Sequence, residues 1–263
     1  MNIAVFYGNK DIFTRPLIEH WLQKGHTVRW SPNYSIWDNF IPDIMFFDMV
    51  TSNLVGYTNR FPETAAKVVT RMHGVGCRLN IYKAVKWEKV HDIIYVSDWL
   101  KEQCPIQKVN MHVVYNGVDL NKFYLKKSFE RTYKIAYIGY LGHLKGIDKL
   151  ESILKKFKKI NERYTLHKAL GDVKDINAWL EDKDYLIQPS NYETFCYAVA
   201  EAMAKGIRPL IAKWPGAERT WGNEFWLDDF NLTQEPERFR KIIEDKYNQI
   251  RMLNEIDTIC GIQ

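Results

Sequence analysis

The strongest constraint on the fold is an alternation of short apolar runs with segments of helical periodicity. The first run is "NIAVFY" (2–7), and the helix-like segment after it spans about 12–24. Further runs follow in the same rhythm as far as "MHVVYNGVD" (111–119). Strands that alternate with helices favour parallel βαβ units, because a parallel connection needs a crossover. The pattern therefore predicts an α/β protein.

The alternation stops at a polar stretch and then starts again. Residues 120–132, "LNKFYLKKSFERT", have neither a helical nor a strand period, whereas "YKIAYIG" (133–139) begins a second series of strands. That series includes "DYLIQPS" (184–190) and "RPLIAKW" (208–214), and the acidic–basic segment 234–256 has the pattern of a terminal helix. We therefore predict two α/β domains joined by a hinge.

The predicted first domain spans residues 1–122, the linker 123–132, and the second domain 133–263 with the terminal helix. Ligands of open parallel sheets bind beyond the C-terminal ends of the strands, where loops enter helices. Candidate functional residues are therefore expected at the strand ends of both domains.

Composition is ordinary, with a small excess of positive charge. The chain is 46% hydrophobic and 26% charged, and it has no apolar stretch of the roughly 18 residues that a membrane span requires. Its net charge of +5 would suit an anionic ligand, a nucleic acid or an acidic membrane surface. The N-terminal "MNIAVFYGNKD" predicts a first strand rather than a secretory signal. Scattered cysteines without metal spacing predict free thiols in a reducing cytoplasm: Cys77, Cys104, Cys196 and Cys260.

A glycine-rich turn follows the first strand of the second series. The segment "YIGYLGHLKGIDKL" (137–150) places Gly139, Gly142 and Gly146 around Lys145. Glycines let backbone amides approach a phosphate, and Lys145 would add a full positive charge. The residue order is neither that of a nucleoside-triphosphate P-loop nor that of the dinucleotide fingerprint. A phosphate-binding turn and a plain glycine turn with a surface lysine both fit.

Two glutamates eight positions apart mark a later strand-to-helix junction, "PSNYETFCYAVAEAMAKG" (189–206). Glu193 precedes the predicted helix start, and Glu201 lies about two turns into the helix. Amides of residues 194–196 would point out of the helix start toward phosphate oxygens, and the carboxylates could accept bonds from sugar and ribose hydroxyls. The alternative is a helix with one glutamate favoured by the dipole and one exposed glutamate.

Three further features allow a functional or a structural interpretation. His73, in "TRMHGVGC", ends an apolar strand beside glycines, which suits either ligand contact or a structural histidine. Basic side chains spaced about one turn apart within 77–90 could bind an anionic acceptor or membrane, or form a solvated helix face: Lys83, Lys86 and Lys89. Asp182 and Asp184 match an acidic metal pair, but no His or carboxylate cluster lies nearby in the sequence, so no metal is expected.

Together these segments resemble the retaining glycosyltransferases of the GT-B fold, specifically the GT4-like group (glycosyl transferases group 1). "VVYNGVDLNKF" (113–123) is similar to that family's segment between its domains, and "IAYIGYLGHLKGIDKL" (135–150) to its phosphate-gripping loop. "LIQPSNYETFCYAVAEAMAKGIRPLIA" (186–212) resembles its Glu-x7-Glu helix, and "MHG" (72–74) its N-domain histidine. The resemblance covers most of the chain, is strongest in the C-terminal half, and implies two Rossmann-like domains facing a central cleft.

The resemblance also implies a role for each matching residue. Glu193 would contact hydroxyls of the donor sugar, Glu201 the ribose of its nucleotide, and Lys145 the leaving diphosphate. His73 would touch the sugar from the opposite domain. The remaining donor-binding residues would surround the diphosphate: Gly8, Asn9, Gly139, Tyr140, Thr194, Phe195, Cys196 and Tyr197. No metal is implied, because protein cations and helix amides stabilise the departing charge.

The implied activity is the retaining transfer of a hexose-like group from a UDP- or GDP-sugar. Two acceptor classes stay open: a glycan or lipid precursor at an anionic membrane surface, or a hydroxymethylated DNA base, as in small phage enzymes. No obligate protein partner is implied, and the location expected is the cytoplasm or the membrane periphery. The rival function is an inactive nucleotide-sugar-binding module.

The chain departs from the family pattern at two positions and is short for the family. Tyr140 stands where the family usually has Arg, and Cys196 where it usually has Gly. The first departure removes a cation from the leaving-group site, and Arg71, Arg78 and His143 are the candidates to replace it.

Overall fold

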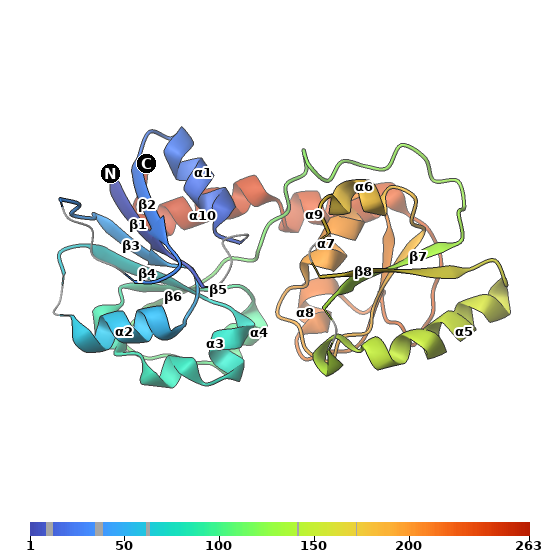
Figure 1. Cartoon of the computed structure of the whole chain (residues 1–263), viewed down its shortest axis with the longest axis horizontal. Helices are drawn as coiled ribbons and strands as arrows, with labels where there is room; N and C mark the ends of the chain where they lie inside the picture. Colours follow the sequence, from blue (N-terminus) through green and yellow to red (C-terminus); the bar gives the residue numbers. More distant parts are fainter. Residues whose placement is uncertain (9–12, 35–38, 62–63, 141, 172) are drawn as a thin grey trace. The chain divides into compact units, whose positions relative to one another are not determined.

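The computed structural model describes residues 1–8, 13–34, 39–61, 64–140, 142–171 and 173–263. These residues form two compact α/β units (Figure 1). One comprises Met1–Tyr115 with Arg251–Gln263, and the other comprises Asn116–Ile250. Of the predicted site residues, Asn9 lies outside the described part of the chain.

The described residues of the first unit contain a six-stranded sheet in which every neighbouring pair is parallel. The strand order is β2 (Thr27–Ser31), β1 (Asn2–Phe6), β3 (Ile44–Phe47), β4 (Lys67–Met72), β5 (Asp92–Tyr95) and β6 (Asn110–Val113). The central strands are buried along nearly their whole length, as a sheet covered on both faces requires. Each strand coincides with a predicted apolar run.

Helices cover both faces of this first sheet. One hydrophobic cluster joins Ile3 and Val5 of β1 to α1 (Arg15–Gln23) and α10 (Gln249–Cys260). The opposite cluster joins the alternate β1 residues to α2 (Ser52–Arg60) and α4 (Asp98–Gln103). A short helix, α3 (Gly74–Arg78), follows directly after β4 and its His73.

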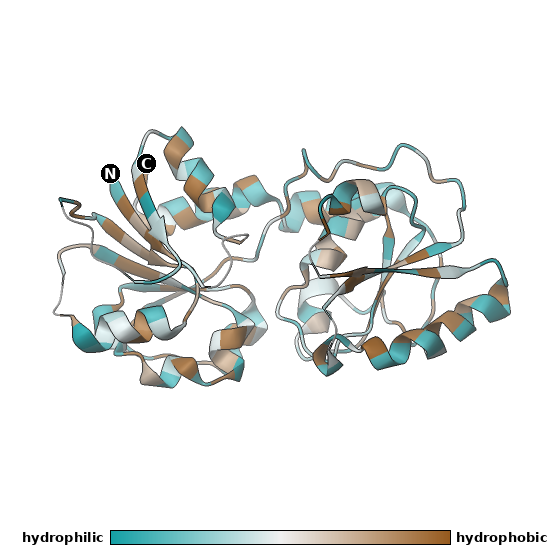
Figure 2. Cartoon of the chain, in the orientation of Figure 1, coloured by the Kyte–Doolittle hydropathy of each residue, from teal (hydrophilic) through white to brown (hydrophobic). Residues whose placement is uncertain are grey.

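The second unit is built on a smaller parallel sheet of the same kind. Its strand order is β10 (Arg208–Ile211), β9 (Tyr185–Gln188), β7 (Lys134–Gly139) and β8 (Thr165–Leu170). The α-helices of this unit are α5 (Leu150–Ile160), α6 (Ile176–Leu180), α7 (Tyr197–Ala204), α8 (Ala217–Trp221) and α9 (Pro236–Lys246). Figure 2 shows apolar and polar residues alternating along α5, whose Leu150, Ile153 and Phe157 are buried. The predicted fold class, α/β with Rossmann-like domains, is confirmed.

The terminal segment differs from the single helix expected over 234–256. It forms two helices, because α9 ends at Lys246 and residues 247–248 are held against the chain after β6, where Val118 N donates to Tyr247 O at 2.8 Å. The following helix, α10, then packs in the first unit. Its Asp257 accepts a hydrogen bond from Trp21 Nε1 of α1 at 2.8 Å and pairs with Lys24 Nζ at 2.9 Å. Residues 251–263 thus belong with the first unit, and the unit boundary falls at 115/116 rather than near 122–133.

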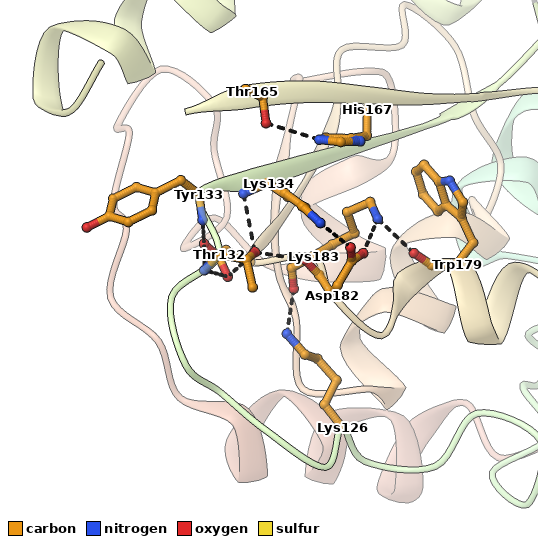
Figure 3. A network of polar contacts seen from close by, with 10 residues as sticks. Lys126, Thr132, Tyr133, Lys134, Thr165, His167, Trp179, Asp182 and Lys183 are labelled. Atoms are coloured by element: carbon orange, nitrogen blue, oxygen red, sulfur yellow. Dashed lines mark hydrogen bonds and ion pairs between the residues drawn. The ribbon is translucent and has the colours of Figure 1, made fainter. Parts of the chain in front are cut away.

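The linker is fastened to the second unit by the acidic pair that resembled a metal motif (Figure 3). Asp184 accepts hydrogen bonds from the backbone amides of Thr132 and Tyr133, the latter at 2.7 Å. Asp182 pairs with Lys134 Nζ at 2.6 Å and also contacts Lys183. Both carboxylates are therefore occupied by protein donors, and among the described residues no group of three or more His, Cys, Asp or Glu side chains could hold a metal ion.

Two expectations for the first unit are wrong. Cys77 and Cys104 are not free thiols but form a disulfide, because α3 and the end of α4 follow neighbouring strands and bring the two Cα atoms to 6.1 Å. Cys196 and Cys260 are free and buried. The lysine-rich stretch 77–90 is not one helix after α3 but two 3-10 turns, Ile81–Ala84 and Trp87–Lys89, separated by extended backbone at Val85. Lys89 Nζ donates to the carbonyl of Phe61, so the three lysines do not form a common face.

None of the helices in the described residues is long and apolar enough to cross a membrane.

Candidate functional site

Two of the predicted loops meet at the C-terminal edge of the second sheet. The loop after β7 carries Lys145, and the loop after β9 carries Glu193. Because β7 and β9 are hydrogen-bonded neighbours, their C-terminal ends lie together. The Nζ atom of Lys145 lies 2.6 Å from Oε1 of Glu193. The structure therefore brings two of the predicted catalytic residues into direct contact.

A close backbone approach seats the lysine turn on the loop after β9. Gly146 has φ +64°, and a Cβ there would lie 2.0 Å from the carbonyl oxygen of Pro189. Asn191 N donates to Leu144 O at 2.9 Å, and the Asn191 side-chain amide donates to His143 O at 2.8 Å. Lys149 Nζ in turn donates to Asn191 Oδ1 at 2.6 Å. The position of Lys145 is thus fixed by backbone packing on both sides of its turn.

Glu193 is held by further donors besides Lys145. Ser190 Oγ donates to Glu193 Oε1 at 2.9 Å, and Gln188 Nε2 lies 3.5 Å from the same oxygen. Burial alone would lower the pKa of Lys145, but the negative charge of Glu193 outweighs it and raises that pKa above its usual value. Lys145 therefore stays protonated across the physiological pH range. The Lys145 side chain is 31% exposed and that of Glu193 is 11% exposed.

The helix after this loop, α7, begins later than the sequence predicts. The amides expected at the helix start were those of residues 194–196. α7 starts at Tyr197, so Thr194 and Phe195 precede it and Cys196 is its N-cap residue. Cys196 has φ +72°, in the left-handed region that favours glycine. This explains why a glycine is expected at this position in the family pattern. The thiol is buried, and burial raises its pKa, so it stays protonated and uncharged.

Glu201 lies on α7 and differs from the exposed glutamate of the structural alternative. Its side chain is partly buried, and no described residue forms a hydrogen bond with its carboxylate. Desolvation raises the pKa of Glu201 to about 7, although the charge of Lys122 opposes the shift. A carboxylate that is desolvated without a partner has unused acceptor capacity for a ligand hydroxyl.

His73 lies in the first unit, within a buried charged cluster. Its neighbour Asp48 follows β3, pairs with Arg71 Nη1 at 3.0 Å and accepts a hydrogen bond from the Thr14 hydroxyl. Burial opposes the ionisation of Asp48, but the charge of Arg71 overcomes it and holds the pKa of Asp48 below its usual value. His73 Nε2 lies 3.8 Å from Asp48 Oδ1, and burial lowers the pKa of His73, so the imidazole is neutral.

This cluster is compatible with His73 as a ligand contact and as a structural histidine. It excludes Arg71 as a replacement for the arginine that the family pattern has at the position of Tyr140. Nε2 of His73 is buried with no hydrogen-bond partner in the part of the chain that the structure describes. Arg71 is fully buried against Asp48, so it cannot supply the cation that is lost at Tyr140. Tyr140 itself is 52% exposed, directly after β7.

Two residues of the site were not singled out from the sequence: Gln188, which donates to Ser190, and Lys149, which holds Asn191. Ser190, which holds Glu193, was expected only as one of the residues at a strand end. A signal was present for Gln188, since "QPS" ends an apolar run immediately before the acidic loop. Of the other predicted donor-binding residues, Gly139 ends β7 in the second unit. Gly8 follows β1 in the first unit, close to Met49, whose Sδ would lie 3.5 Å from an added Cβ.

Comparisons with known proteins show the fold. No protein-family model matches the chain, and no curated protein matches its sequence. Among solved structures it is similar to sucrose-phosphate synthase from Thermosynechococcus elongatus, with a TM-score of 0.71, 13% identity and 98% of each chain covered. It is also similar to HepE of Anabaena in complex with UDP and glucose (TM-score 0.67, 13% identity, 99% of each chain). A third is AviGT4, a glycosyltransferase involved in avilamycin A biosynthesis (TM-score 0.63, 11% identity, 99% of this chain and 97% of that one). The shared architecture is that of GT-B glycosyltransferases.

Proposed function

We propose that this protein is a glycosyltransferase that takes a sugar from a nucleotide-diphosphate sugar. The observation that carries the proposal is the Lys145–Glu193 pair, 2.6 Å apart at the C-terminal edge of the second sheet and just before the start of α7. A cation, helix amides and a carboxylate at one strand edge suit a ligand that combines phosphate charge with hydroxyl groups. Support comes from the shared fold with HepE, which was solved with UDP and glucose.

In the proposed reaction, most of the rate comes from positioning and from stabilising the leaving group. Lys145 and the amides at the start of α7 would meet the charge that develops on the diphosphate as its bond to the sugar breaks. Glu193 would accept a hydrogen bond from a sugar hydroxyl, and Glu201 would accept one from the ribose.

We propose a retaining course without a metal ion. The acceptor hydroxyl attacks the anomeric carbon on the leaving-group face, and the departing phosphate oxygen takes the hydroxyl proton. The products are then the glycosylated acceptor and the nucleoside diphosphate, with the anomeric configuration kept. Glu193 is given no nucleophilic role in this scheme, since the acceptor hydroxyl itself attacks the anomeric carbon.

Two acceptor classes remain in the proposal, a glycan or lipid precursor and a modified DNA base. Binding to duplex DNA that falls steeply with salt would favour the base, because released counterions drive such binding. Binding to anionic vesicles without detergent would favour the lipid.

The test is release of nucleotide from UDP-glucose and GDP-mannose, measured with and without candidate acceptors. We expect slow hydrolysis by the wild type, and a loss of about 10²-fold or more in turnover for Lys145→Ala, as for the removal of one group that stabilises a developing anion. The matched control is Lys159→Ala, an exposed lysine on α5 of the same unit. Full activity of Lys145→Ala would refute the assigned role. Donor binding without release under any condition would instead support the inactive binding module, which is motivated by Tyr140.

A further inference from the structure

Two buried side chains at the end of β9, Gln188 and Ser190, form hydrogen bonds that hold Glu193. Gln188 and Ser190 are 1% and 0% exposed. Gln188 Nε2 donates to Ser190 Oγ at 2.8 Å, and Ser190 Oγ donates to Glu193 Oε1 at 2.9 Å. The two residues thus form a short relay from the strand end to the carboxylate, and no ligand is needed to complete it.

All the contacts to Glu193 converge on one of its oxygens. Lys145 Nζ, Ser190 Oγ and the longer contact from Gln188 Nε2 reach Oε1, whereas no described residue forms a hydrogen bond with Oε2. A carboxylate oxygen accepts about two hydrogen bonds, so Oε1 is saturated and Oε2 keeps its full capacity. The carboxylate can therefore be oriented by the protein through Oε1 and face a ligand through Oε2.

Lys145 alone could not keep this orientation once a donor binds. A diphosphate carries more negative charge than a carboxylate, so it would compete with Glu193 for the ammonium of Lys145. Glu193 would then lose its charged partner at the moment when its position matters. Ser190 and Gln188 are neutral, fully buried and anchored on β9, so the incoming charge does not displace them.

We propose that Gln188 and Ser190 are positioning residues that hold Glu193 by Oε1, so that Oε2 accepts a hydroxyl of the donor sugar while Lys145 turns to the diphosphate. This inference rests on the proposed function. It assigns sugar recognition to one free carboxylate oxygen rather than to a two-oxygen clamp. Wild-type protein should therefore bind a deoxy-sugar donor, which lacks the hydroxyl facing Oε2, more weakly than the complete donor. The loss of affinity should equal the loss that Ser190→Ala shows for the complete donor.

The experiment compares UDP with UDP-glucose, and GDP with GDP-mannose, by calorimetry on the full chain. Of the donor molecule, Glu193 contacts only the sugar in this proposal. The Ser190→Ala and Gln188→Met variants should therefore bind the bare nucleotide with wild-type affinity. Affinity for the nucleotide sugar should fall about tenfold, the usual effect of one lost hydrogen bond to a charged group. Ser152→Ala is the matched control and should change neither affinity, since Ser152 is an exposed residue of α5 whose hydroxyl donates to the carbonyl of Lys149.

A double mutant separates positioning from general damage. If Ser190 acts through Glu193, then Ser190→Ala should have no further effect on nucleotide-sugar affinity in a Glu193→Ala background, which leaves the Ser190 hydroxyl no acceptor at position 193. Equal losses for nucleotide and nucleotide sugar, or additive losses in the double mutant, would overturn the inference. Wild-type protein that binds neither nucleotides nor nucleotide sugars would instead overturn the proposed function, so the two failures are distinguishable.

Discussion

At the scale of single residues, Glu201 is the group whose surroundings most alter its chemistry. Desolvation raises the pKa of Glu201 to about 7, whereas an unfolded glutamate titrates near 4.3, on the order of the model-peptide value. The folded state therefore binds this proton more tightly than the unfolded state does. The stabilising contribution is complete below the unfolded pKa and is lost as pH rises through the folded pKa.

We predict that Glu201→Gln makes stability less sensitive to pH between about 4.5 and 7. At pH 4 the variant and the wild type should unfold at similar urea concentrations. At pH 8 the variant should be more stable by about 1–3 kcal/mol, since a neutral amide avoids burying the charge. Urea unfolding followed by circular dichroism over this pH range measures the difference.

The control for this titration is Glu151→Gln, at a side chain that is 73% exposed on α5. It should leave the shape of the pH profile unchanged. Parallel profiles for wild type and Glu201→Gln would show that Glu201 is solvated and would return it to the structural alternative.

The sequence identifies Lys145 and Glu193, because a strand-end glycine turn and an acidic strand-to-helix junction are local patterns. It does not show that the two side chains touch, since their contact depends on β7 and β9 being neighbours. The sequence also does not show that Cys196 has a left-handed backbone conformation. Cysteine does not signal positive φ as glycine does, and only the comparison with a family pattern marked the position as unusual.

At the scale of elements, the turn between β7 and α5 is fixed against the end of β9 by one glycine. Gly146 combines a positive φ with a backbone contact that leaves no room for a Cβ. Gly171, after β8, has φ +76° but open space around its Cα. Comparing substitutions at Gly146 and Gly171 therefore separates two contributions to the loss of stability, that of a left-handed backbone and that of the contact with Pro189.

We predict that Gly146→Ala is far more damaging than Gly171→Ala. The second change should cost only the left-handed penalty of about 1–2 kcal/mol. The first adds a collision with Pro189 O that the backbone must relieve by moving the turn, so it should also abolish the Lys145–Glu193 contact and nucleotide-sugar binding. Thermal unfolding and calorimetry on both variants measure this, and equal costs would show that the turn is not seated on β9.

Element types and strand positions were predictable where a strand is a short apolar run with a turn signal at its end, as in β1, β3, β5, β7, β9 and β10. The helix starts were less so. α5 begins at Leu150, after two 3-10 turns, and α7 begins at Tyr197, because the loops that carry Lys145 and Glu193 pack on each other before either helix can start. The tertiary contact, rather than local propensity, sets these boundaries.

At the scale of the whole chain, the sequence predicts two α/β units, but it does not show on which of them the last helix packs. Hydrophobic spacing shows that residues 249–260 have a buried face, and it says nothing about which sheet that face meets. In the structure, Ile256 and its neighbours on α10 pack in the core formed by β1, β3 and α1. Asp257 reinforces this packing by accepting hydrogen bonds from Trp21 of α1 and from Lys24, which directly follows α1.

We predict that Ile256→Ala destabilises the first unit and leaves the second unit unchanged. Ile256 is fully buried, so truncation should cost about 2–5 kcal/mol, whereas Ile250→Ala, at a residue 61% exposed on the same helix, should cost little. Hydrogen exchange followed by mass spectrometry localises the effect. Peptides covering β1 and β3 should lose protection in Ile256→Ala, while those covering β7 and β9 should not. Loss of protection in β7 and β9 instead would assign the terminal helix to the second domain, as the sequence alone suggests.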